Sequence, residues 1–206
     1  MPVNLYVMPM CNSECDEALG YWTIGIQYLH LVETVANETI QQGNKFVVVS
    51  NDKVSLEQYD SQTKWSDHAL VVPLLFDFYH GAEVLLKGFL ASKGKILEKN
   101  HKLSDLLKAF DDLFPGHSLS TLLSRYIVND KLPEPLASFC SQSSISIDDY
   151  YQALKYPEST NGNIYRHTPL KYRSDAGLTF FNGLVSDIKQ VRRDAVELGR
   201  SICPKA

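Results

Sequence analysis

Hydrophobic residues recur every three to four positions through most of this 206-residue chain, which is the spacing of amphipathic helices. The sequence predicts five main helices, at residues 13–42, 66–92, 103–113, 118–127 and 176–198. Gly43 marks the end of the first, since glycine favours helix C-termini. The second is expected to begin at Ser66 or at Pro73, because proline is tolerated in a first turn. These runs predict an all-α bundle of four to five helices.

Two segments interrupt the helical pattern. In residues 43–65, the β-branched run Phe46–Val49 is followed by a polar turn and then by alternating apolar residues. That order predicts a small β-hairpin inserted between two helices. Residues 129–175 are broken up by proline, glycine and serine, with one short helix expected at 147–154. We therefore expect a single domain spanning 1–206, with a hairpin insertion and a long, functional loop before the closing helix.

The composition is that of a soluble globular protein, with 44% hydrophobic and 21% charged residues. Twenty Lys and Arg against 24 Asp and Glu give a net charge of −4. That balance argues against a surface that attracts nucleic acid everywhere, and it leaves room for a local basic patch. Neither a basic start followed by an apolar stretch nor a membrane-spanning run is present, which predicts a cytoplasmic protein without membrane contact.

The four cysteines do not have the spacing of a metal site. Cys11 and Cys15 are four residues apart, while Cys140 and Cys203 lie far along the chain. Zinc sites use closely spaced Cys or His pairs, so we expect no metal and free thiols. Phosphate-binding loops, dinucleotide fingerprints and hydrolase motifs are also absent from the sequence, and no cofactor is predicted.

Three polar residues within or beside the apolar runs are candidates for ligand contact. Glu83 and Lys87 are one helical turn apart, and His101 precedes the next helix. Glu83 and Lys87 form either a buried ion pair facing a site or an exposed pair worth a few tenths of a kcal/mol. His101 either contacts a ligand or supports the helix start.

The pattern of these residues resembles the HEPN superfamily over roughly residues 71–198. The resemblance is carried by Gly81-Ala-Glu83-x3-Lys87, by His101-x-Leu-x2-Leu-Leu, and by Tyr156-Pro before a closing helix. Members of that superfamily are four- to five-helix bundles found in prokaryotic toxins, abortive-infection proteins and CRISPR effectors. The resemblance implies a homodimer in a defence or toxin–antitoxin setting.

Active members of the superfamily carry an Arg followed four to six residues later by a His, near the start of the last helix. The resemblance implies a metal-independent ribonuclease site, in which His transfers protons and Arg stabilises charge on the phosphate. Here Arg173 occupies the position of the Arg, but residues 178–180 are Leu, Thr and Phe. The chain departs from the family pattern at its catalytic His.

A different polar cluster lies just before the last helix. It combines cationic, titratable and aromatic side chains within nine residues: Tyr165, Arg166, His167, Lys171, Tyr172 and Arg173. Such a set can hold a phosphate and stack a base, or it can be a solvated loop. If the protein cleaves RNA, we expect Arg166, His167 and Arg173 to be catalytic. Tyr165, Lys171 and Tyr172 would then bind substrate, together with Glu83, Lys87 and His101.

A second group of cations follows on the closing helix and beyond it, at Arg192, Arg193, Arg200 and Lys205. Cations near a helix C-terminus are favoured by the helix dipole, and we interpret them as structural. The sequence thus favours an RNA- or nucleotide-binding protein, with a metal-independent endoribonuclease as its enzymatic form. The alternative is a non-catalytic module that docks another protein.

Overall fold

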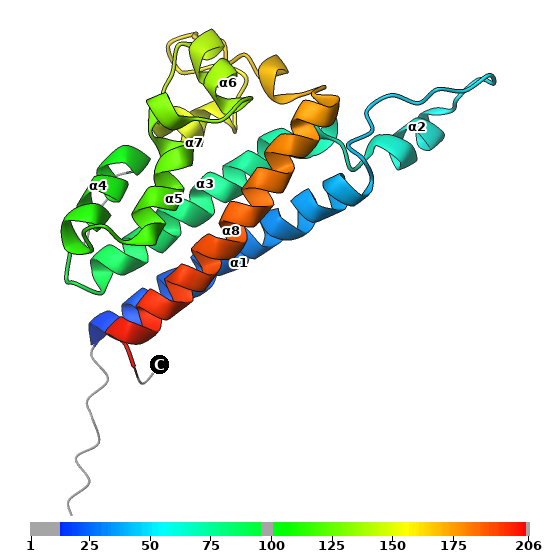
Figure 1. Ribbon diagram of the computed structural model, residues 1–206. Coiled ribbons are helices and arrows are strands. Elements are labelled where there is room, and N and C mark those ends of the chain that lie inside the picture. The colour runs from blue at the N-terminus through cyan, green and yellow to red at the C-terminus, as the bar shows by residue number, and fades with distance from the viewer. Residues whose placement is uncertain (1–12, 96–100, 205–206) are drawn as a thin grey trace, which may run out of the picture.

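The computed structural model describes residues 13–95 and 101–204, which form an assembly of helices (Figure 1). In that part of the chain there are eight α-helices and no strand: α1 Ser13–Gln41, α2 Leu56–Thr63, α3 Asp67–Ala91, α4 Leu103–Leu113, α5 Ser118–Ile127, α6 Leu136–Ser143, α7 Tyr150–Ala153 and α8 Ser174–Ile202. Short 3-10 turns lie at 129–131, 147–149 and 168–170. The prediction of an all-α helical bundle is confirmed.

Three long helices make the centre of the bundle. α1 packs along α3, and α8 runs antiparallel beside α1 (Figure 1). α4 and α5 pack against the C-terminal half of α3. The short helices of residues 129–170 gather at the end of the bundle where α8 begins (Figure 1). The five predicted main helices all exist, each beginning and ending within about four residues of the predicted limits.

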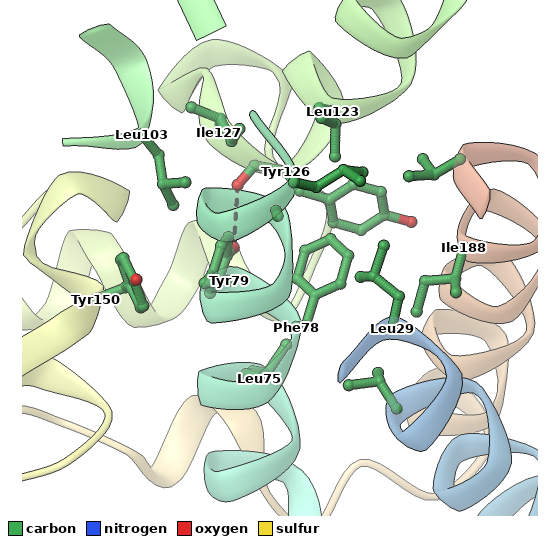
Figure 2. Close-up of a cluster of buried hydrophobic side chains, with 14 of the residues drawn as sticks. Leu29, Leu75, Phe78, Tyr79, Leu103, Leu123, Tyr126, Ile127, Tyr150 and Ile188 are labelled. Carbon is green, nitrogen blue, oxygen red and sulfur yellow. Dashed lines mark hydrogen bonds between the residues drawn. The ribbon is translucent and has the colours of Figure 1, made fainter. Parts of the chain in front are cut away.

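The core lies where α3 is surrounded by α1, α5, α7 and α8. Figure 2 shows side chains from all of these helices converging on Leu75, Phe78 and Tyr79. The Tyr79 hydroxyl is fully buried and donates to the backbone oxygen of Tyr126 at 3.0 Å. A buried hydroxyl without a partner would cost about 1–3 kcal/mol, so this bond allows a tyrosine in the core.

α1 and α3 approach closely because glycines replace side chains at their contact. A Cβ on Gly25 would lie 3.0 Å from the backbone of α3, and one on Gly88 would lie 2.6 Å from Cδ1 of Trp22. Trp22 therefore packs closely against α3, with its ring centroid 5.0 Å from that of Phe89.

The predicted β-hairpin at 43–65 is wrong. Phe46–Val49 forms no strand and no helix, and Val49 is 94% exposed. The second half of the segment forms α2, whose first turn is closed by a reciprocal capping box between Ser55 and Gln58. An isolated two-stranded hairpin is marginal in water, and this segment projects away from the bundle (Figure 1), so no sheet stabilises the strands.

α3 begins at Asp67, so Pro73 lies inside the helix rather than in its first turn. The proline ring is on the exposed side, where water can satisfy the backbone oxygen that loses its partner. α3 is also long and apolar enough to cross a membrane by length and composition alone. More than half of its most apolar stretch is buried inside the bundle, as in the core helix of a soluble protein.

A disulfide joins Cys15 in the first turn of α1 to Cys203 at the end of α8, with a Cα–Cα distance of 6.0 Å. The expectation of free thiols is wrong for these two residues, because the antiparallel packing of α1 and α8 brings together cysteines that are 188 positions apart. Cys140 is free and buried, and burial raises the pKa of its thiol to about 11. Cys11 lies outside the described residues.

Candidate functional site

The side chain of Glu83 is the centre of a polar cluster between α3, α7 and the start of α4. Glu83 is 2% exposed and accepts hydrogen bonds from three side chains. Lys87 Nζ lies 2.6 Å from Oε1, His101 Nδ1 lies 2.9 Å from the same oxygen, and the Tyr150 hydroxyl donates to Oε2. Because an ionised carboxylate only accepts, the proton of the His101 ring is on Nδ1.

These three donors keep Glu83 ionised. Burial raises the pKa of the carboxyl, but the bonds from Lys87, Tyr150 and His101 together outweigh it, and the pKa falls below its usual range. The same contact, added to burial, raises the pKa of Tyr150, so its hydroxyl stays a donor. Glu83 therefore acts as a fixed negative anchor that orients a lysine and a histidine, and it is not a proton donor at neutral pH.

Next to the Glu83 carboxylate lies a surface of aromatic rings, which the ammonium group of Lys155 contacts. Tyr151 stacks on the half-exposed ring of His101, with centroids 5.1 Å apart. Lys155 Nζ lies 4.3 Å from the ring centre of Tyr151, 5.6 Å from Tyr156 and 5.8 Å from Phe76. Tyr151 and Tyr156 are 37% and 53% exposed. We call these residues, together with the Glu83 cluster, the α3–α7 site.

Further rings continue the α3–α7 site toward α1. Phe76 stacks on His80 at 5.9 Å, and His80 meets the edge of Tyr28 from α1 at 4.8 Å. The Nδ1 atom of His80 is buried without a hydrogen-bond partner among the described residues. Burial also raises the pKa of the neighbouring Asp77, partly offset by His80. The rings therefore extend the aromatic surface across α3, away from the Glu83 anchor.

The residues predicted to be catalytic are not held together. His167 Nε2 lies 2.6 Å from the backbone oxygen of Ala153, and its ring stacks on Phe139 at 5.4 Å. Arg173 pairs with Glu134 at 3.2 Å. Arg166 is exposed, and its backbone N–H donates to the hydroxyl of Ser143 at 2.8 Å. In the described part of the chain, no hydrogen bond, ion pair or ring contact joins any two of the three predicted catalytic residues.

The other predicted residues of that segment also have separate surroundings. Tyr165 is buried and belongs to the hydrophobic core, and Lys171 is half-buried. Tyr172 is 49% exposed, and its ring stacks on His68 at 4.7 Å. The structure thus brings together Glu83, Lys87 and His101, whereas the contacts of the described 165–173 segment give its predicted site residues different partners.

Asp67 organises the approach to α8, a role that the sequence did not reveal. Its carboxylate accepts from the backbone N–H groups of Tyr172 at 2.8 Å and Arg173 at 2.7 Å, and from the Asn44 amide at 3.0 Å. Tyr172 and Ser174 have left-handed backbone conformations, with φ of 60° and 45°. We call this arrangement the Asp67 clasp. The only signal in the sequence was an acidic residue in the first turn of a helix, which is too common to indicate a long-range bond.

The described residues contain no group of three or more His, Cys, Asp or Glu side chains that could hold a metal ion. The α3–α7 site offers one anchored anion, one histidine and two lysines beside exposed rings. Such a site is suited to binding a planar group by stacking and a phosphate by charge.

Comparison of the chain with protein-family models, curated proteins and solved structures finds no match. What the fold and site define is therefore an all-α helical protein with a polar and aromatic surface site, without a family assignment.

Proposed function

We propose that this protein binds single-stranded RNA or a nucleotide at the α3–α7 site. The observation that carries the proposal is Lys155, whose ammonium lies over the rings of Tyr151 and Tyr156 while both rings remain exposed. Bases stack on exposed aromatic rings, and a neighbouring cation contacts the phosphate. His101, held by Glu83, stacks on Tyr151 and adds its half-exposed ring to this aromatic surface.

The HEPN resemblance is part of this proposal. Its support is that Glu83, Lys87 and His101, which carry the resemblance, form one bonded cluster in an all-α bundle. A HEPN-like protein would act as a homodimer in a stress or defence setting, and an active one would cleave RNA without metal. The proposal for this chain is binding; cleavage is its enzymatic extension.

We expect Tyr151→Ala to weaken binding of a fluorescein-labelled RNA oligonucleotide by about 5- to 100-fold, and Lys155→Gln to weaken it by less. A base stacked on an aromatic ring is worth about 1–3 kcal/mol, and loss of a phosphate contact has a smaller, salt-dependent effect. Fluorescence anisotropy at about 50 mM salt measures this, because phosphate contacts are strong there.

Tyr172→Ala is the matched control, since Tyr172 is also an exposed tyrosine but lies at the Asp67 clasp. Weakening by Tyr172→Ala alone would move the site to the 165–173 segment. Binding by none of the proteins would remove the proposal. Cleavage is tested by incubating the same proteins, and an Arg166→Ala/His167→Ala/Arg173→Ala variant, with RNA in the presence of EDTA. Loss of cleavage only in that triple variant would assign those residues to a metal-independent nuclease.

A second candidate function, docking of another copy or another protein, is favoured by one face of α1. Ile24 and Leu31 are 49% and 48% exposed, although both are large and apolar. With Tyr21, Tyr28 and Val35 they repeat at alternating spacings of three and four residues. That spacing is the seam of paired helices, and an apolar stripe of this kind marks an interaction surface.

We expect Ile24→Glu/Leu31→Glu to convert a dimer into a monomer in size-exclusion chromatography with light scattering. Carboxylates placed opposite each other in such a seam repel, and they lose the apolar contact as well. His30→Glu/Thr34→Glu, on exposed positions of the same helix, is the control for added charge. A wild-type protein that is monomeric at all concentrations would leave the stripe to a different partner and contradict the dimer.

A further inference from the structure

A groove between α1 and α8 has an apolar half and a basic half that adjoin. The apolar half is a pocket of about 330 Å³, within the size range of small-molecule sites. Its lining residues include Leu19, Trp22, Ile26, Ala195, Gly199 and Cys203. The Cys15–Cys203 disulfide lies at its end.

The pocket exists because α8 presents small residues to the largest side chain of α1. Ala195 and Gly199 are one turn apart on α8, and a Cβ on Gly199 would lie 3.3 Å from the six-membered ring of Trp22. With only small residues at these two positions, Trp22 is among the residues that line the pocket. A ligand in the pocket would therefore contact an indole ring.

The basic half is a second pocket of about 420 Å³, which shares Ile26, Val196 and Arg200 with the first. It is lined by four cations and one carboxylate: Lys189, Arg192, Arg193, Arg200 and Glu197. This excess of positive charge occurs in a protein whose net charge is −4. It is a local feature rather than a consequence of composition.

The helix dipole does not account for these cations. Its effect is confined to the last turn of a helix, and in α8 only Arg200 is in that turn. Arg192 forms an ion pair with Glu33 of α1, and Lys189 is 4.0 Å from the same carboxylate. These contacts leave the Nε atom of Arg192 buried without a partner, within the described residues.

Two arginines in the basic half have no carboxylate partner in the described part of the chain. Among the described residues, the Arg193 side chain bonds only to the neutral amide of Gln190, at 2.5 Å, and the Arg200 side chain has no bond; both arginines are exposed. Arginine is the side chain best suited to carboxylates and phosphates, which it binds with two parallel hydrogen bonds. Arg200 lines both pockets. One ligand could therefore place its anion against Arg200 and an attached apolar group in the pocket that Trp22 lines.

We propose that this groove binds a small amphipathic anion, a carboxylate or phosphate carried on a single alkyl chain. The chain lies in the apolar pocket against Leu19, Trp22 and Gly199, and the anion is held by Arg193 and Arg200. This proposal does not rest on RNA binding, since the α3–α7 site is formed by other residues.

The test is a fluorescence titration of the Trp65→Phe protein with its Cys15–Cys203 disulfide formed. In this variant Trp22 is the one remaining tryptophan. Decanoate and decyl phosphate are the probes, used below the concentrations at which they form micelles. We expect a saturable change in Trp22 emission, with an affinity about 10-fold or more weaker in Arg193→Gln/Arg200→Gln, because the variant loses the charge-assisted hydrogen bonds to the anion. Decanol, which has the chain without the charge, is expected to bind more weakly and equally to both proteins.

Lys45→Gln/Lys108→Gln removes two exposed cations elsewhere and controls for net charge; it should bind like wild type. Thr23→Phe, at an exposed position on the rim of the apolar pocket, should block the chain while leaving the fold intact. Equal affinity of decanoate in the double-arginine variant and in wild type would overturn the proposal. So would a response only to an acidic amphipathic peptide, which would make the groove a protein-docking surface.

Discussion

Replacing Asp67 by Ala is expected to destabilise the protein by about 3–5 kcal/mol, which is a large part of the stability of an ordinary domain. Asp67 is 1% exposed and accepts three hydrogen bonds, two of them from the backbone of residues 172 and 173. Without the carboxylate these part-buried N–H groups lose their partner, and hydrogen bonds to a charged group are worth about 1.5–3 kcal/mol each. Urea unfolding followed by circular dichroism measures the loss.

The backbone around the clasp adds to the expected effect. The left-handed conformations of Tyr172 and Ser174 cost about 1 kcal/mol or more each, and the carboxylate helps to hold them. Asp67→Asn keeps one acceptor oxygen and should lie between Ala and wild type. Asp60→Ala, at an exposed position of α2, removes the same charge and should change stability by less than about 0.5 kcal/mol. A loss below 1 kcal/mol in Asp67→Ala would contradict the clasp.

Replacing Glu83 by Leu is expected to cost about 3 kcal/mol at neutral pH. The change removes the acceptor of Tyr150 and the counter-ion of Lys87, and breaking one side of a buried ion pair is costly because the other charge is left unpaired. Lys87 is 19% exposed, so water reduces part of that cost.

The effect of Glu83→Leu is also expected to depend on pH. The pKa of Glu83 is lowered in the folded protein from an ordinary value of 4.5, so its contribution to stability is present above pH 4.5 and is lost as the pH falls through the folded pKa. The difference between variant and wild type in urea should therefore shrink below pH 4.5. A difference that stays constant from neutral pH to about pH 3 would show that the loss comes from packing.

Asp77→Asn, on the same helix, is not expected to lower stability at neutral pH as Glu83→Leu does. Burial raises the pKa of Asp77, partly offset by His80, so its charged form is disfavoured in the folded protein. Removing that charge should leave stability at neutral pH unchanged or slightly increased. A loss of stability in both Glu83→Leu and Asp77→Asn would indicate that any substitution in α3 disturbs the core.

The long helices could be predicted from the sequence because their apolar spacing is dictated by burial. α4 is the clearest case: Leu103, Leu106, Leu107 and Phe110 recur at helical spacing and are all buried. The segment 46–59 was harder, because β-branched residues favour strands while the capping box of Ser55 favours a helix. In the structure no neighbouring strand is available, and the local capping signal prevails.

The candidate site was predictable only where its residues are neighbours along a helix. The spacing of Glu83 and Lys87 indicated their ion pair, whereas Tyr150, 67 residues away, gave no signal of its bond to Glu83. The same holds for Asp67 and for Cys203, whose partners are distant in sequence. Conversely, the concentration of Arg and His in 165–173 suggested a common site, but the turn at 168–170 directs His167 and Arg173 to different neighbours.

The Cys15–Cys203 bond gives the chain the topology of a closed ring that includes nearly all of its described residues. The segment around Val49 is exposed and projects from the bundle, which makes it accessible to proteases (Figure 1). A single cut there would open the ring without releasing a fragment. The product would remain one covalent molecule, with α1 attached to α8 through sulfur and with its new ends at the cut.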